Sequence, residues 1–450
     1  MQEKTKIIKF LAFLIIGLLL CQCKEEPISQ VTEQEVATKW AELSLDITKN
    51  TPANSPTFAS RCLGYIGLTM YESIVPGYKE YHSLAGQLNQ LEELPKPEED
   101  KSYNWPLSLN AGQAAILRSL YIQTADSNKV KIDSLEHLIF RSLSHQIPDK
   151  AIIEASVDFG KEIASSIFEW SKTDGGHRGY LKNFDKTLVH PKFPGSWKPP
   201  LYAQSFSHHP LHPYWGKNRT FLNINQNLPD PKIISYDTSR TSANYQQFLA
   251  VYEKDKQLTQ AEKEAALWWG DDPADTFTPP GHSYYIATKV IKAKQPPLIK
   301  CAETYAQVGM AVADAFINCW KWKYQFFSER PNTFIPTFID EEWESFWPDP
   351  PFPSFPSGHA IQAAAAATVL IDLYGPNFTF VDDAHVGRER DELREVDFVA
   401  RPFNSFWEVA EETANSRFYG GIHTAQDNVV GLEEGAKIAT NVNQLNWRTE

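Results

Sequence analysis

The sequence predicts an all-α fold, with two helical bundles joined by a proline-rich connector. From about Glu33 onward apolar residues recur at helical spacing, whereas runs that alternate apolar and polar residues are few. Hydrophobic residues make up 42% of the 450, which is enough apolar surface for a large buried core. The length suits two subdomains or one large bundle. We expect a signal segment at 1–23 and two regions at 24–235 and 236–450.

Prolines, glycines and polar segments interrupt the helical pattern and delimit the expected elements. In the N-terminal half the expected helices are 33–49, 57–73, 111–125, 127–143 and 149–172. In the C-terminal half they are 241–252, 259–269, 284–291, 302–327, 358–373, 404–416 and 425–443. Residues 183–235 are crowded with proline, histidine and aromatic residues, which argues against helix and predicts an ordered connector. Residues 382–397 are dense in charges of both signs, which predicts a solvated loop, and we assign no function to it.

The N-terminus resembles the export signal of a bacterial lipoprotein. Three lysines precede eleven uncharged residues, 10–20, a run shorter than the ~17 to 25 residues that a membrane-spanning helix needs. Cys23 is the expected acylated residue and Cys21 the competing one, while ordinary signal cleavage nearby is the alternative. We therefore expect an exported protein, periplasmic or on the surface of a bacterial envelope. Only its lipid would hold it to a membrane.

Charge and cysteine content exclude two classes of protein. The formal net charge of −13 would repel a phosphate backbone, so nucleic acid is not an expected partner and any anion site must be local. Beyond the signal only Cys62, Cys301 and Cys319 remain, too few for a disulfide framework. The last two lie in one expected helix, roughly 27 Å apart at ~1.5 Å per residue, and cannot bridge each other.

The first segment with chemical meaning is Lys323, followed seven residues later by Arg330 and Pro331. Seven residues are two helical turns, so we expect both cations to project from one face of a helix that Pro331 ends. Two like charges in this position are unfavourable unless an anion or acids lie between them. Alone, such a pair is more often two solvated cations at a helix end.

The second segment is Ser357-Gly358-His359, where a rigid proline-rich stretch turns into an alanine-rich helix. A helix N-terminus offers unpaired N–H groups and the positive end of the helix dipole. Gly358 lets an anion approach the backbone, and Ser357 adds a hydroxyl donor. His359 would then lie beside the bound anion. The plainer alternative is a serine cap with a bystander histidine.

The third segment contains Arg417 and, after a pair of glycines, His423 and Asp427. The glycines predict a helix stop and a turn, with Arg417 and His423 on either side of the corner. On the next helix His423 and Asp427 would share a face, so that the carboxylate holds the imidazole in one orientation and tautomer. A pair at this spacing is also often structural.

Together the three segments supply what an enclosed tetrahedral oxyanion requires: three cations, a hydroxyl, a glycine at a helix start and two histidines. They resemble the vanadium-dependent haloperoxidases and their relatives, the acid phosphatases and type 2 phosphatidic acid phosphatases. The family pattern is Lys, six residues, Arg-Pro; then Pro-Ser-Gly-His; then Ser-Arg, five residues, His, three residues, Asp. Its fixed positions are met by Lys323, Arg330, Pro331, Pro356, Ser357, Gly358, His359, Ser416, Arg417, His423 and Asp427.

The resemblance implies a role for each matched side chain. His423 would be the axial ligand of vanadium in a haloperoxidase, or the phosphorylated nucleophile in a phosphatase. His359 would be the acid/base partner, and Asp427 would orient His423. The residues that would neutralise or hydrogen-bond the oxygens of vanadate or phosphate are Lys323, Arg330, Arg417, Ser357 and the Gly358 N–H.

The resemblance also implies a helical-bundle fold, vanadate as the cofactor, and hydrogen peroxide and a halide as reaction partners. An organic acceptor and a homo-oligomer stay open. A phosphomonoesterase is the alternative function, because no residue in the three motifs separates the two reactions. A non-catalytic binding protein is a third interpretation, which the two intact histidines disfavour.

The similarity to exported bacterial haloperoxidases covers roughly residues 33–443. Residues 268–282 resemble the segment that places an acid behind the pocket. Counting from Trp269 gives Asp272 as that acid, whereas counting back from Thr278 gives Asp271, so both remain candidates.

Two aromatic residues are expected in the pocket wall by the same resemblance. Trp320 stands where haloperoxidases carry a tryptophan, and Phe352 stands where family members carry Phe or His. Ordinary core packing is the alternative for both. An apolar wall dehydrates a halide, and iodide, the least hydrated and most easily oxidised, would lose least. We therefore expect iodide first, bromide second and chloride last.

Overall fold

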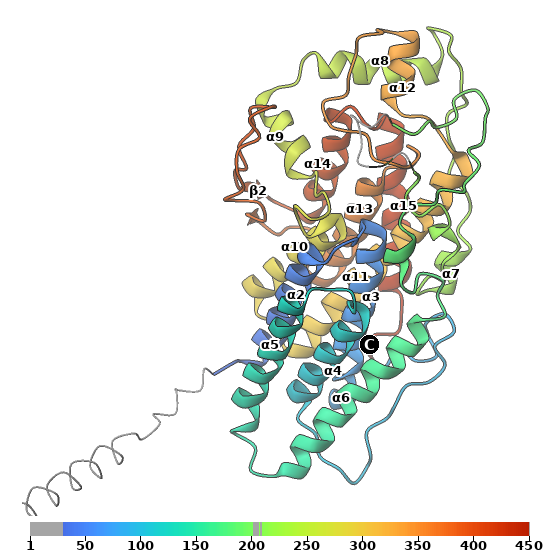
Figure 1. The fold of residues 1–450 in the computed structure, drawn as a ribbon. Coiled ribbons are helices and arrows are strands. Elements are labelled where there is room, and N and C mark those ends of the chain that lie inside the picture. Colours follow the sequence, from blue (N-terminus) through green and yellow to red (C-terminus); the bar gives the residue numbers. More distant parts are fainter. Residues whose placement is uncertain (1–29, 201–206, 208, 450) are drawn as a thin grey trace, which may run out of the picture.

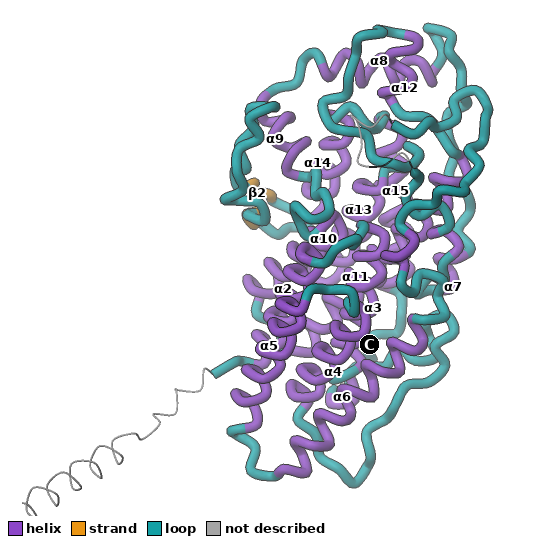
Figure 2. Tube along the Cα trace, viewed as in Figure 1, coloured by secondary structure: helices purple, strands orange, loops and turns teal. Residues whose placement is uncertain are grey.

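Helices make up most of the structure, a computed structural model that describes residues 30–200, 207 and 209–449. Within these ranges the only strands are β1 (Phe380–Asp382) and β2 (Arg401–Phe403), which pair antiparallel (Figure 2). The all-α prediction is thus confirmed. The expected signal segment, with Cys21 and Cys23, lies outside the described residues.

The N-terminal helices begin at polar caps that the sequence provides. Thr32 and Glu35 form a reciprocal capping box, and Ser55 caps a helix whose first residue is proline. One helix begins at Trp105 rather than at 111, because Asn104 caps it and Pro106 fits its first turn, where no N–H is needed. The helices are α2 (Glu33–Asn50), α3 (Pro56–Glu72), α4 (Trp105–Leu120), α5 (Asp126–Ser144) and α6 (Lys150–Ser171).

The C-terminal helices follow the predicted pattern, with two differences. One helix starts at Thr278, six residues before the predicted start, because two prolines occupy its first turn instead of preceding it. A short helix that was not predicted begins at Pro331. The elements are α8 (Ala243–Asp255), α9 (Gln260–Trp268), α10 (Thr278–Lys294), α11 (Leu298–Phe326), α12 (Pro331–Phe338), α13 (Gly358–Tyr374), α14 (Phe406–Tyr419) and α15 (Ala425–Asn443).

Helix α11 lies in the middle of the molecule, between α3 and α13 (Figure 1). Residues 301–320 are buried without exception, including a few polar side chains such as that of Asp314, so this helix has no solvent-facing side there. One hydrophobic cluster extends from Val31 to Trp447 and includes residues from both halves of the chain. Because α11 is fixed on every side, the side chains at its C-terminal end have defined positions.

The proline-rich connector is fastened to α11 by hydrogen bonds. Its described part contains only the short helices η3 (Trp215–Lys217) and α7 (Asn223–Gln226). The buried carboxylate of Asp314 accepts the backbone N–H of Phe221 at 2.6 Å, and the indole of Trp320 donates to the Leu211 carbonyl at 3.1 Å. The expectation of an ordered connector is therefore confirmed for these residues.

The charged stretch 382–397 is not simply a solvated loop, so that prediction was wrong. Asp382 and His385 are buried, with exposed fractions of 0% and 3%. Asp383 between them and most of the charged residues that follow them are exposed, which is why the stretch looked solvated in sequence. In the described part of the chain, no helix is both long and apolar enough to cross a bilayer.

A glycine sets the close packing of α15 on α13. A Cβ on Gly435 would lie 2.1 Å from the carbonyl oxygen of Ile361, a backbone atom that cannot turn aside. We expect Gly435→Ala to lower the free energy of unfolding by about 1–3 kcal/mol, the usual cost of overpacking. Urea denaturation measures this. The exposed Glu433→Ala on the same helix is the control, and equal stability of the two variants would contradict the packing argument.

Candidate oxyanion site

The chain between Lys323 and Arg330 breaks out of the helix, contrary to the prediction of one continuous helical face. Helix α11 ends just before Phe327, whose φ of 50° is left-handed, and Arg330 is the N-cap of α12. Pro331 therefore starts a helix instead of ending one. The two cations still meet, because both reach the carbonyl of Pro353, Lys323 Nζ at 2.9 Å and Arg330 Nη2 at 3.3 Å.

Backbone carbonyls hold both cations in place. Lys323 Nζ also donates to the Ser354 carbonyl at 2.5 Å. Arg330 donates to the carbonyls of Phe352 at 2.9 Å and Ile422 at 2.7 Å. The prolines of residues 350–356 keep this segment extended, and because they have no N–H groups the segment does not pair into a helix or sheet. Its carbonyls are therefore free to accept hydrogen bonds from the two cations. The positions of the two charges are thus set before any anion binds.

The start of α13 forms the second wall, as predicted. Ser357 is its N-cap, fully buried, with its hydroxyl accepting the N–H of Ala360 at 3.4 Å. Gly358 has ordinary helical geometry, so its backbone does not require glycine. A Cβ there would lie 3.6 Å from the Trp320 ring and 3.9 Å from Cε of Lys323. The glycine therefore keeps space open in front of the lysine.

His359 has an imidazole nitrogen with no partner. Its Nε2 is buried and makes no hydrogen bond to any described residue, while the Gly270 carbonyl accepts a hydrogen bond from the ring. Burial lowers the pKa of His359 well below its usual value, and the charge of Arg417 acts in the same direction. The imidazole is therefore neutral at neutral pH, with Nε2 free to accept a proton.

The corner after α14 brings Arg417 and His423 to the same pocket. Arg417 lies in the last turn of α14, and Gly421, at φ 72°, makes the turn that follows. The guanidinium is 1% exposed and donates to the Ala266 carbonyl at 2.5 Å. The predicted arrangement on either side of a turn is observed.

His423 is oriented by two side chains. It precedes α15 instead of lying on it, yet its Nδ1 donates to Asp427 at 2.9 Å. Asp427 belongs to the first turn of α15 and also accepts the hydroxyl of Ser354 at 2.6 Å. With Nδ1–H donated to Asp427, Nε2 carries a lone pair, which accepts a long hydrogen bond of 3.5 Å from Arg330 Nη1. Burial, aided by the Arg330 charge, lowers the pKa of His423 to about 3, so the ring stays neutral.

Lys323, Arg330 and Arg417 are all buried, and none has a carboxylate within the 4.0 Å of an ion pair among the described residues. Burial lowers the pKa of Lys323 to about 7 and that of Arg417 to about 10. Buried charges without partners are costly. A bound tetrahedral oxyanion supplies the missing negative charge, so these residues fit vanadate or phosphate.

A cavity of about 310 Å³ opens beside this site, and of the three cations Arg417 alone is among its lining residues. Gly358, His359, Arg417 and His423 line it, and the two aromatic residues predicted for its wall, Trp320 and Phe352, lie there with ring centroids 4.9 Å apart.

Both candidate acids behind the pocket line the cavity, and they have different partners. The Asp271 carboxylate is bound by two histidines, His282 and His385. Asp272 interacts with the charge of Arg417, but burial dominates and raises the pKa of Asp272 to about 6. Counting from Trp269 and counting back from Thr278 therefore each led to an aspartate that lines the cavity.

The sequence did not reveal two functional candidates, Ser354 and Asp349. Ser354 supports Asp427, and a serine between a proline and a phenylalanine carries no signal for that contact. Asp349 lines the cavity with Oδ1 buried and without a partner, and burial raises its pKa to about 7 against the Arg330 charge. Its place within a run of prolines indicated only a connector.

The comparisons with known proteins agree with this geometry. A family profile described as the VCPO second helical-bundle domain matches residues 336–448. A solved structure described as the first bacterial vanadium-dependent iodoperoxidase is 30% identical, with 95% of this chain and 99% of that chain covered and a TM-score of 0.80. A holo-type bacterial vanadium-dependent chloroperoxidase is 16% identical, with 93% and 98% covered and a TM-score of 0.68. Among curated proteins no significant relative is found.

Proposed function

Because this chain belongs to the vanadium-dependent haloperoxidase family, an enzyme family whose cofactor is vanadate, we propose that it oxidises iodide, and bromide less readily, with hydrogen peroxide. One observation carries the proposal: three buried cations without carboxylate partners lie at the same site as a histidine whose Nε2 lone pair meets only a long hydrogen bond from one of them, Arg330. The 30% identity to a bacterial iodoperoxidase over nearly the whole chain supports iodide as the first halide to test.

The residues of the pocket divide the work of holding the cofactor. Bound vanadate supplies a Lewis-acidic centre that activates peroxide for oxygen transfer to a halide. His423 Nε2 would be its protein ligand, held in register by Asp427 and Ser354. Lys323, Arg330 and Arg417 would neutralise its oxygens, and the start of α13 would hydrogen-bond them.

His359 is the proton carrier in this proposal. Its neutral ring keeps Nε2 available, so it would accept a proton from peroxide at neutral pH and return it to a leaving oxygen. Lower pH weakens this function, because Nε2 of His359 can accept no further proton once it is protonated. The apolar rings of Trp320 and Phe352 would exclude water from the halide, which costs iodide least.

A paired assay on one preparation tests the proposed function. Protein loaded with vanadate is given peroxide with iodide, bromide or chloride, and a second aliquot without vanadate is given an aryl phosphate. We expect turnover to fall in the order iodide, bromide, chloride. Chloride oxidation as fast as iodide oxidation would refute the halide order, and turnover of the aryl phosphate alone would establish a phosphatase instead.

The pKa of Lys323 predicts how oxyanion binding depends on pH. At a pKa of about 7 the lysine loses its charge as pH rises, whereas a bound anion favours the ammonium form, so binding above pH 7 takes up a proton. We expect the Kd of the vanadate-free protein for sulfate, whose own charge is constant, to rise by up to about tenfold per pH unit above 7. Calorimetry measures both the Kd for sulfate and the proton uptake that accompanies binding. The side chain at this position stays charged in Lys323→Arg, so the rise of the Kd above pH 7 should disappear in that variant. A pH slope equal to that of the wild type would contradict the assignment to Lys323.

We propose further that the protein is exported and lipid-anchored, because the lysines and apolar run at its N-terminus match a lipoprotein signal. Mass spectrometry of the mature N-terminus tests this. A diacylglyceryl group on Cys23 is the expected result, and an unmodified N-terminus at Met1 would refute export.

A further inference from the structure

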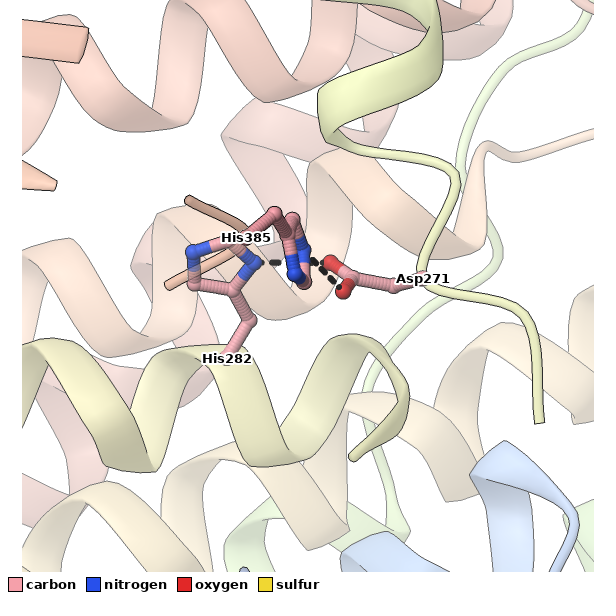
Figure 3. A group of neighbouring side chains, drawn as sticks. All are labelled: Asp271, His282 and His385. Carbon is pink, nitrogen blue, oxygen red and sulfur yellow. Dashed lines mark hydrogen bonds and ion pairs between the residues drawn. The ribbon is translucent and has the colours of Figure 1, made fainter. Parts of the chain in front are cut away.

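Four buried side chains form one hydrogen-bonded chain beside the pocket, here called the His–Asp chain: Asp382, His282, Asp271 and His385 (Figure 3 shows the last three). His282 Nε2 lies 2.9 Å from Asp382, and its Nδ1 lies 2.8 Å from Asp271. The other oxygen of Asp271 lies 2.9 Å from His385 Nε2. All four residues are at most 3% exposed.

The contacts fix the protonation of His282. Both of its ring nitrogens face carboxylates, and a carboxylate only accepts, so both nitrogens must carry hydrogen and the ring is an imidazolium. Burial alone would lower the pKa of His282, but the charges of Asp271 and Asp382 outweigh it and raise that pKa to about 10. The remaining lone pairs of Asp382 accept the indole of Trp268 at 2.7 Å and the N–H of Ala384 at 3.0 Å.

A metal ion could also be held by the two histidines and Asp271, since their ligand atoms lie within 4.8 Å of one another. The hydrogen bonds argue against one. Each nitrogen that would bind the ion already lies 2.8 to 2.9 Å from its own oxygen of Asp271. A doubly protonated His282 between two carboxylates accounts for these contacts with protons alone. We therefore treat a metal as an outcome that the experiment must exclude.

The His–Asp chain passes through a loop, residues 270–272, whose three residues all line the anion pocket. The Gly270 carbonyl accepts a hydrogen bond from His359, Asp271 links the two histidines of the chain, and Asp272 is the main charge acting on Arg417. Asp271 itself has a left-handed φ of 49°, which a non-glycine residue adopts only where its surroundings hold it. The groups facing Asp271 are the two histidines, Arg417 and His359.

We propose that His282 is a positioning residue of the haloperoxidase pocket: its imidazolium binds Asp271 and thereby holds residues 270–272 against His359 and Arg417. The proposal rests on the oxyanion site described above but not on the choice of halide. The proposal gives a function to the buried part of residues 382–397, because Asp382 binds His282 and His385 binds Asp271. It also explains why a charged cluster is buried beside an anion site although only Asp271 of its four members lines the cavity.

Histidine NMR of ¹⁵N-labelled protein tests the charge state directly and needs no active enzyme. In the wild type we expect one histidine to keep both ring protons at about pH 8.5, far above the usual histidine pKa. The signal of this ring should be absent from the spectrum of His282→Gln. If the signal that disappears instead belongs to a ring that loses its proton near pH 6.5, the proposal fails.

Sulfate binding to the vanadate-free protein tests the positioning role. We expect His282→Gln to raise the Kd for sulfate about tenfold, the lower end of what loss of supporting partners costs a site, and to shift the acid limb of the activity profile that His359 sets. Asp174→Asn is the matched control, since it breaks the buried Arg61–Asp174 pair away from the pocket and should leave sulfate binding within about twofold.

Three results would overturn the proposal. The first is an equal loss of affinity in both variants, which would show a general loss of stability. The second is an unchanged Kd in His282→Gln. The third is a stoichiometric transition metal in the wild type that His282→Gln loses, which would make the cluster a metal site. If His282→Gln does not fold, Asp382→Asn, which keeps an acceptor for Trp268, replaces it in the same assays.

Discussion

His423→Ala is expected to abolish vanadate retention and with it the peroxidase activity. The variant removes the side chain whose Nε2 faces the buried cations, and no other imidazole nitrogen lies within hydrogen-bond distance of Arg330 in the described structure. Loss of a partner that merely supports a metal ligand typically costs about 10 to 100-fold in affinity. Loss of the ligand itself should cost at least that much.

Equilibrium dialysis of vanadate, with phosphate binding as a second measurement, checks this result. The three cations remain in His423→Ala, so phosphate should still bind, which shows that the pocket has folded. Asp427→Asn is the graded control, because it keeps the ligand and weakens only its orientation. Vanadate held as tightly by His423→Ala as by the wild type would exclude His423 as the ligand.

His359→Ala is expected to separate rate from binding. The imidazole makes no contact that fixes the cations, so vanadate affinity should change only a few-fold, whereas loss of a positioned proton carrier typically costs about 10²- to 10⁴-fold in rate. The wild-type rate should fall toward acid pH as Nε2 becomes protonated, and that acid limb should vanish in the variant.

Steady-state kinetics at saturating vanadate, together with a vanadate titration, distinguish the two effects. Equal and mild losses in His359→Ala and His423→Ala would refute the division of roles between the two histidines. A large loss of vanadate affinity in His359→Ala would make this residue part of the oxyanion cradle instead.

Motif spacing predicted the composition of the site better than its backbone. Lys323 and Arg330 were placed together for the wrong reason, since a left-handed residue at Phe327 breaks the helix between them. Their meeting depends on the carbonyls of a distant proline-rich segment, and no local pattern encodes such a contact. His423 and Asp427 also pair, although His423 lies outside the helix that contains Asp427.

Tertiary burial accounts for most of what the sequence could not show. Asp382 and His385 lie among exposed charged residues, and only the approach of α10 from a hundred residues earlier makes them partners of His282 and Asp271. Ser354 is similar, because its partner Asp427 is 73 residues away. Helix starts such as that of α13 were predictable, because the cap and the residues it serves are neighbours in sequence.

A crystal structure of the protein grown with vanadate tests the central claim most directly. The account predicts one tetrahedral or trigonal-bipyramidal group in the pocket, bonded to His423 Nε2, with Lys323, Arg330 and Arg417 all donating to its oxygens. Vanadate bound elsewhere, or a pocket group that leaves any two of these cations without contact, would contradict it.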